Sequence, residues 1–104
     1  MGKTKIIHEL TNILAKALRH RIGSIVNPDE VYAQKYARDA DVLLKEAQKA
    51  AAKENWNSYD KTKIRRELAK RLQDELEKKD FIDNKKFDIM EEEMDKALKS
   101  LGLA

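Results

Sequence analysis

The sequence predicts an all-α protein, specifically a four-helix bundle built from two antiparallel helical hairpins. Apolar residues recur every three or four positions in four segments, which is the period of a helix with one buried face. Short stretches that contain glycine, proline, asparagine or aspartate separate these segments. A chain of 104 residues has room for one core, and two hairpins with one apolar side each must cover one another. We therefore expect a single helical domain spanning residues 1–104.

The composition is that of a highly charged chain that can still form a core. Charged residues make up 39% of the chain and hydrophobic residues 41%. The formal net charge is only +3, so net charge alone does not indicate a nucleic-acid partner. The sequence has no cysteine, no signal-peptide core and no run of the roughly 18 apolar residues that a membrane span needs. We therefore expect a cytoplasmic protein without a membrane partner.

The first predicted helix covers residues 4–22. Its buried face is expected to consist of aliphatic side chains about one turn apart, namely Ile7, Leu10, Leu14, Leu18 and Ile22. Gly23 follows at the position where a left-handed residue commonly ends a helix. Lys16, Arg19, His20 and Arg21 then lie near the helix C-terminus, where the helix dipole favours cations without any functional reason.

The second predicted helix covers residues 28–53 and begins at the clearest local signal in the chain. Asn27 can cap the helix, Pro28 suits its first position, and Glu30 can return a hydrogen bond to the cap. Pairing this helix antiparallel with the first places Tyr36 opposite Leu14. The two helices are therefore predicted to form the first hairpin.

This register leaves three alanines, Ala47, Ala50 and Ala51, beyond the start of the first helix. Their small side chains permit close helix approach, so we expect another element to pack against these three alanines. This element is expected to be either the end of the fourth helix or a second copy of the chain.

The third predicted helix covers residues 60–79, with Ile64, Leu68, Leu72 and Leu76 on its buried face. The preceding link at residues 54–59 breaks the helical period and contains the only tryptophan. We interpret Trp56 as a packing plug under this link, with a partner anchor as the alternative. Ser58 or Asp60 is expected to cap the third helix.

The fourth predicted helix covers residues 84–101 and ends at Gly102. Its buried face is expected to be Phe87, Met90, Met94, Ala97 and Leu101. Pairing it antiparallel with the third helix places Leu72 opposite Met94 and Lys70 opposite Asp95. We expect its acidic residues to be satisfied mainly within the same helix, through Glu92 with Lys96 and Asp95 with Lys99.

The charges of the third helix are reversed relative to its dipole, because cations crowd its first turns and carboxylates its last. A sequence that breaks a local rule marks a candidate functional site. Together with two lysines of the fourth helix, these cations define the candidate nucleic-acid-binding residues: Lys61, Lys63, Arg65, Arg66, Lys70, Lys96 and Lys99.

The sequence contains no pattern typical of catalysis or of a cofactor site. No nucleophile stands with a base, and no set of metal ligands is visible, because His8 and His20 lie three helical turns apart. We therefore expect no enzyme activity, no catalytic residue, no metal, no cofactor and no small-molecule substrate.

The leading hypothesis is a small non-enzymatic helical protein that binds nucleic acid, DNA or RNA, through its phosphate backbone. The alternative is a module for protein–protein interaction or oligomerisation, such as a homodimer. A remote alternative is a histidine phosphotransfer protein, because His20 lies on a predicted helical hairpin, the usual setting of such histidines.

Overall fold

The computed structural model describes residues 2–80 and 82–104. The described residues contain no strand and form four α-helices and one 3-10 turn, in the order α1 (Gly2–Val26), α2 (Ala33–Ala51), α3 (Ser58–Glu77), η1 (Asn84–Phe87) and α4 (Met90–Ser100). This arrangement confirms the predicted all-α class and the predicted helical bundle.

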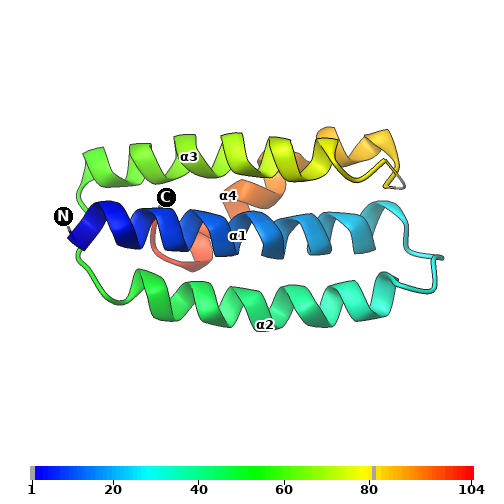
Figure 1. Ribbon diagram of the computed structural model, residues 1–104, viewed down its shortest axis with the longest axis horizontal. Helices are drawn as coiled ribbons and strands as arrows, with labels where there is room; N and C mark the ends of the chain where they lie inside the picture. Colours follow the sequence, from blue (N-terminus) through cyan, green and yellow to red (C-terminus); the bar gives the residue numbers. More distant parts are fainter. Residues whose placement is uncertain (1, 81) are drawn as a thin grey trace.

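The central element of the bundle is α1. Figure 1 shows α1 between α3 and α2, with the short α4 crossing obliquely behind α1. α1 packs against all three other helices, whereas the backbone of α2 lies close only to that of α1 among the described helices. The fold is therefore a layer of three long helices, with α4 covering one face of it.

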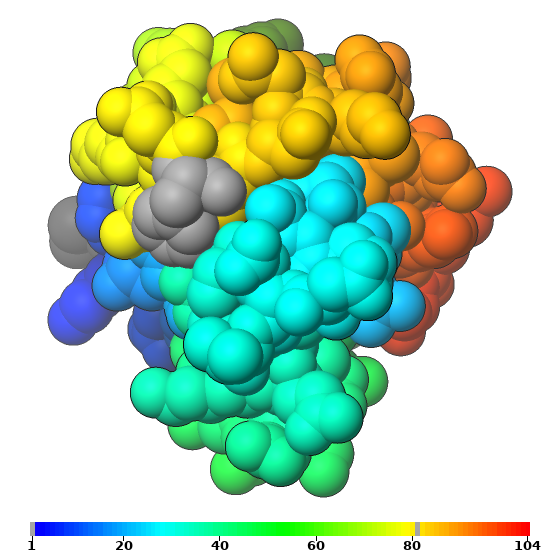
Figure 2. Space-filling view, turned by 90° about the vertical axis from the view of Figure 1, so that its right-hand side faces the viewer, coloured from blue at the N-terminus to red at the C-terminus, as the bar shows by residue number. Residues whose placement is uncertain are grey.

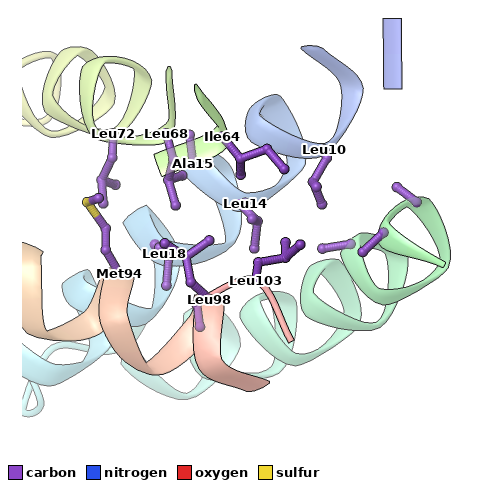
Figure 3. Packing of buried hydrophobic residues seen from close by; sticks show 14 of the residues in the cluster. Leu10, Leu14, Ala15, Leu18, Ile64, Leu68, Leu72, Met94, Leu98 and Leu103 are labelled. Atoms are coloured by element: carbon purple, nitrogen blue, oxygen red, sulfur yellow. The ribbon is translucent and has the colours of Figure 1, made fainter. Parts of the chain in front are cut away.

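The main core lies where α1, α3 and α4 meet. Figure 3 shows Leu72 of α3 pointing toward Met94 of α4, as the predicted register requires. The predicted buried faces of α1 and α3 are confirmed, since at most 2% of each of these residues is exposed: Ile7, Leu10, Leu14, Leu18, Ile22, Ile64, Leu68, Leu72 and Leu76. α4 inserts Leu98 into this core, while the predicted core residue Leu101 is only half-buried.

The prediction that Gly23 ends the first helix is wrong, because α1 continues to Val26. Gly23 is buried inside the helix, and its missing side chain makes room for neighbours. A Cβ atom at this position would lie 3.0 Å from Cδ2 of Tyr36 and 3.3 Å from Cδ1 of Ile82. The glycine therefore permits close packing rather than a change of chain direction.

The predicted start of the second helix at Pro28 is also wrong, because α2 begins at Ala33. Asn27 does not cap α2; its side-chain Oδ1 accepts a hydrogen bond from the backbone N–H of Asp83 at 3.1 Å. Figure 2 shows this loop packed against the connection between α3 and α4. The side chain of Asn27, which the local pattern assigned to the cap of α2, is thus used in a tertiary contact instead.

The longer loop shifts the register between α1 and α2. The ring of Tyr36 meets His20 edge-on, with 4.9 Å between ring centroids, and lies over Gly23. The prediction placed Tyr36 opposite Leu14, which is nine residues before Gly23, or about 13 Å along the helix axis. The predicted register of the first hairpin is therefore wrong.

The new register solves the predicted problem of the alanine overhang. Ala47, Ala50 and Ala51 are buried in the same apolar cluster as Leu10 of α1. Leu103, just after α4, belongs to this cluster and lies next to Leu14 in Figure 3. The alanines are therefore covered within one chain, and a second copy is not needed to bury them.

The start of α3 is fixed by a reciprocal capping box. Asn57, rather than the predicted Ser58 or Asp60, is the N-cap. Its Oδ1 accepts from the N–H of Asp60 at 2.8 Å, and Oδ2 of Asp60 accepts from the N–H of Asn57 at 3.1 Å. Trp56 donates from its ring N–H to the carbonyl of Ala51 at 2.8 Å and packs against the core, which confirms its predicted role as a plug.

The connection between α3 and α4 is longer than predicted, because α3 ends at Glu77 and α4 begins only at Met90. Lys86 of η1 is buried, and its Nζ donates to the carbonyl of Lys79 at 2.8 Å. A cation suits this position, since the C-terminal end of a helix is electronegative. Phe87, predicted to be core, is exposed instead.

Gly102 ends α4, as predicted. Among the glycines that the structure describes, Gly102 is the one with a positive φ angle, which is 72°. Its N–H donates to the carbonyl of Lys99 at 3.1 Å, and the N–H of Leu103 donates to that of Leu98 at 2.8 Å. This is a Schellman motif, and it returns Leu103 to the core.

Candidate nucleic-acid interface

The seven predicted binding residues do not form one continuous patch. Five of them lie on α3 and two on α4, and their ion pairs divide them into two groups. Arg65 and Lys96 are each bound to carboxylates of α4. The other five make no ion pair within the part of the chain that the structure describes: Lys61, Lys63, Arg66, Lys70 and Lys99.

Arg65 is neutralised by the acidic residues of α4. Its Nη1 lies 2.6 Å from Oδ1 of Asp95, and its Nη2 lies 3.5 Å from Oε1 of Glu91. The sequence predicted that Asp95 would lie opposite Lys70 and pair with Lys99. That prediction is wrong because α4 crosses the layer obliquely, which brings Asp95 beside Arg65 instead.

Lys96 lies on another side of α4, next to α1 and α2. Its Nζ is 3.3 Å from Oε1 of Glu92, as predicted, and 3.2 Å from Oε2 of Glu93. The hydrogen bond that Lys96 donates to Glu93 is the main reason that the pKa of Lys96 is raised above its ordinary value, and Glu92 adds to the effect. Lys96 also lines a small pocket with Leu18 and Leu44. It is therefore separated from the basic residues of α3.

The outer face of α3 carries the cations that remain available. Lys63, Arg66 and Lys70 follow one another at intervals of one helical turn, and we call these three residues the basic stripe. Arg66 and Lys70 are exposed, and Lys63 is half-buried. Tyr59, one turn before Lys63, is 75% exposed. Tyr59 is not among the seven residues predicted from the sequence, although its spacing of four residues from Lys63 was a signal for it.

The remaining two candidates lie beside the stripe or away from it. Lys61 lines a shallow hollow with Thr62 and Leu103, on the side of α3 that meets the C-terminal segment. Lys99 is exposed on α4. The structure thus concentrates the accessible positive charge of α3 on the basic stripe.

Carboxylates lie beside the stripe and just before its start. Glu67 and Asp74 line a depression together with Lys70. At the other end Asp60 is engaged by Lys3, whose Nζ is 2.8 Å from its Oδ2, and by the N–H of Asn57. The hydrogen bond from Lys3, followed by that from Asn57, holds the pKa of Asp60 below its ordinary value. These carboxylates narrow the stripe, but in the described chain none of them forms an ion pair with Lys63, Arg66 or Lys70.

The cations of α1 have a structural explanation that differs from the predicted one. Since α1 runs on to Val26, its last turn contains no basic residue. Instead, Arg19 donates to Glu75 of α3 at 2.9 Å, and Arg21 donates to the buried Glu93 of α4 at 2.9 Å. These arginines connect α1 to its neighbours.

Both histidines are also held by neighbouring groups. Nδ1 of His8 accepts from Nη2 of Arg71 at 2.7 Å, which requires an unprotonated ring nitrogen. Nδ1 of His20 lies 2.7 Å from the carbonyl of Lys16, so this nitrogen carries the proton, and the ring edge meets Tyr36. Phosphotransfer would have to use Nε2 of His20, which lies 3.3 Å from Nη2 of Arg19. In residues 2–80 and 82–104, no three His, Asp or Glu side chains are grouped to hold a metal ion.

Comparison with known proteins does not place the chain in a family. No protein-family model matches the chain, and no curated protein or solved structure is significantly similar to it. None of the described helices combines the length and the apolar character needed to cross a bilayer. Function has to be inferred from the surface chemistry of the bundle.

Proposed function

We propose that this protein is a non-enzymatic nucleic-acid-binding protein, and that the basic stripe of α3 contacts the phosphate backbone. One observation carries the proposal. Lys63, Arg66 and Lys70 share one face of a helix and make no ion pair in the described chain, whereas Arg19 and Arg65 are paired with carboxylates. Cations that are not used to hold the fold together remain free to neutralise phosphates.

The dimensions of the stripe suit a phosphate backbone. Lys63 and Lys70 are seven residues apart, which corresponds to about 10 Å along the helix. One DNA strand carries a phosphate about every 3.4 Å of duplex axis, so the stripe spans roughly three phosphates. The buried face of α3 holds the stripe on a rigid element, and rigid placement reduces the entropy lost on binding. Phosphate contacts of this kind position a ligand without reading its base sequence.

The test is the salt dependence of binding, measured by fluorescence anisotropy with labelled DNA and RNA. Affinity should fall steeply with salt, because each neutralised phosphate contributes a slope of about 0.9 in log K against log salt. Replacing Arg66→Gln and Lys70→Gln together should weaken binding to all sequences and flatten the slope by roughly one to two units.

The matched control removes the same charge from another helix. Lys45 and Lys49 are exposed on α2, so the double change Lys45→Gln with Lys49→Gln alters net charge equally. The control should leave the slope nearly unchanged. If no DNA or RNA binds even at about 50 mM salt, the proposal fails, and the protein-interaction module becomes the function to test.

A further inference from the structure

We infer that the ligand of this surface is single-stranded nucleic acid, with one base stacked on the ring of Tyr59. This inference rests on the proposed function, which it narrows from nucleic acid in general to one structural class. It comes from the position of one aromatic side chain relative to the basic stripe.

Tyr59 is the most exposed of the described aromatic side chains, at 75% against 37% for Phe87. Tyr32 and Tyr36 lie against each other with 4.7 Å between ring centroids, and Trp56 is bonded to Ala51. The ring of Tyr59 makes no aromatic contact in the described chain and is 75% exposed. A single exposed aromatic residue is ordinary on a protein surface, so its significance depends on what surrounds it.

The surroundings of Tyr59 combine rigidity with positive charge. It is the second residue of α3, between the two members of the capping box, Asn57 and Asp60. This box fixes the first turn of the helix, so the backbone that carries the ring is held in place. Lys63 is one turn further along the same face, about 6 Å along the axis. A base stacked on Tyr59 would therefore have its phosphates within reach of Lys63 and Arg66.

This pairing of a ring with a row of cations favours a single strand over a duplex. Proteins that bind single strands combine a basic track for the backbone with aromatic rings on which bases stack. In a duplex the base faces are covered by neighbouring bases, and only the edges are available in the grooves. Glu67 and Asp74 beside the stripe also make the positive track narrow, which suits one backbone better than two.

The test compares Tyr59→Ala and Tyr59→Phe on single-stranded and duplex oligonucleotides of the same length, as DNA and as RNA. The unmodified protein should prefer single strands. Tyr59→Ala should weaken single-strand binding by about 5- to 150-fold, the loss expected for one stacked base, without changing the salt slope. Tyr59→Phe should retain most of the affinity. Val42→Ala, an exposed apolar change on α2, is the control and should have no effect.

The outcomes separate this inference from the proposed function. If Tyr59→Ala binds as well as the unmodified protein while Arg66→Gln with Lys70→Gln does not, the stripe binds phosphates and the stacking inference is overturned. Equal affinity for duplex and single strand would overturn it as well. If no nucleic acid binds at about 50 mM salt, the proposed function itself is overturned. If Tyr59→Ala weakens the binding of single-stranded DNA and of single-stranded RNA equally, the result would support base stacking that does not depend on the sugar.

Discussion

Lys3 of α1 and Asp60 of α3 form an ion pair, with Nζ 2.8 Å from Oδ2, although they are 57 residues apart in the chain. The same Oδ2 atom accepts the backbone N–H of Asn57 at 3.1 Å. One carboxylate thus closes the capping box of α3 and ties that helix to the first turn of α1. Tyr59 lies in this first turn of α3, between the two members of the capping box.

Removing the cap of α3 should lower stability. Asn57→Ala deletes the acceptor for the N–H of Asp60, and the loss of such a cap typically costs about 0.5 to 2 kcal/mol. Asn57→Gly should cost only a few tenths of a kcal/mol. Urea unfolding followed by circular dichroism measures both changes. Asn55→Ala, at an exposed position in the same link, is the control, and a similar loss there would argue against the cap.

The Lys3–Asp60 pair should give the protein a pH-dependent stability in acid. The pKa of Asp60 is lower in the folded chain than its ordinary value of about 3.9. Its contribution to stability is therefore complete above about pH 5 and is lost as pH falls through the folded pKa. The stability difference between the unmodified protein and Asp60→Asn should shrink below about pH 4. In Lys3→Met the folded pKa of Asp60 should lie closer to its ordinary value, so the acid-dependent loss of stability should be smaller and should end at a higher pH. An unchanged profile would exclude the pair as its cause.

Truncation of the core face of α3 should be severely destabilising. Leu68 and Leu72 are fully buried, and replacing either by alanine should cost about 2 to 5 kcal/mol. Val42→Ala, at a position 59% exposed, should change stability by less than about 0.5 kcal/mol. Thermal melts compare the three variants. Small effects at both leucines would contradict the packing shown in Figure 3.

Gly23→Ala should not give the gain usual for a glycine inside a helix. The substitution favours the helix by up to about 1 kcal/mol, but the new Cβ would lie 3.0 Å from the ring of Tyr36. That ring is braced by Tyr32 and His20, so overpacking of about 1 to 3 kcal/mol should outweigh the gain.

The control is a double-mutant cycle with Tyr36→Ala. In the background of Tyr36→Ala the clash with the ring is absent, and Gly23→Ala should become neutral or stabilising. Urea unfolding of the unmodified protein, the two single variants and the double variant shows whether Gly23→Ala raises or lowers stability in each background. A clear increase in stability from Gly23→Ala alone would show that the ring moves aside freely.

Periodicity alone was enough to predict the fold class and most of the core. Leu68 and Leu72 lie where a helix with one buried face must place them, whatever the neighbouring helix is. Signals for helix ends were less reliable, because they compete with tertiary contacts. Asn27 matched a cap pattern, yet its side chain binds the backbone of Asp83, 56 residues further along the chain.

The candidate site could be predicted only in part, because charges are paired by three-dimensional geometry. The basic turns of α3 were evident from the sequence. Arg65 pairs with Asp95 because α4 crosses the other helices obliquely. The predicted register assumed that α4 runs antiparallel to α3, so it did not predict this pair. Exposure of Tyr59 likewise depends on which neighbours approach the first turn of α3.

Among the described helices, α2 has a backbone that lies close only to that of α1, so it is the helix that we expect to detach first. Its buried residues are all alanines, namely Ala33, Ala40, Ala47, Ala50 and Ala51. Detaching α2 therefore exposes, on its own side, these alanines and the half-buried Leu44 and Tyr36, while the leucines shared by α1, α3 and α4 stay together. Backbone amides of α2 should exchange with deuterium through this partial opening, faster than the central amides of α3, which require unfolding of the whole domain.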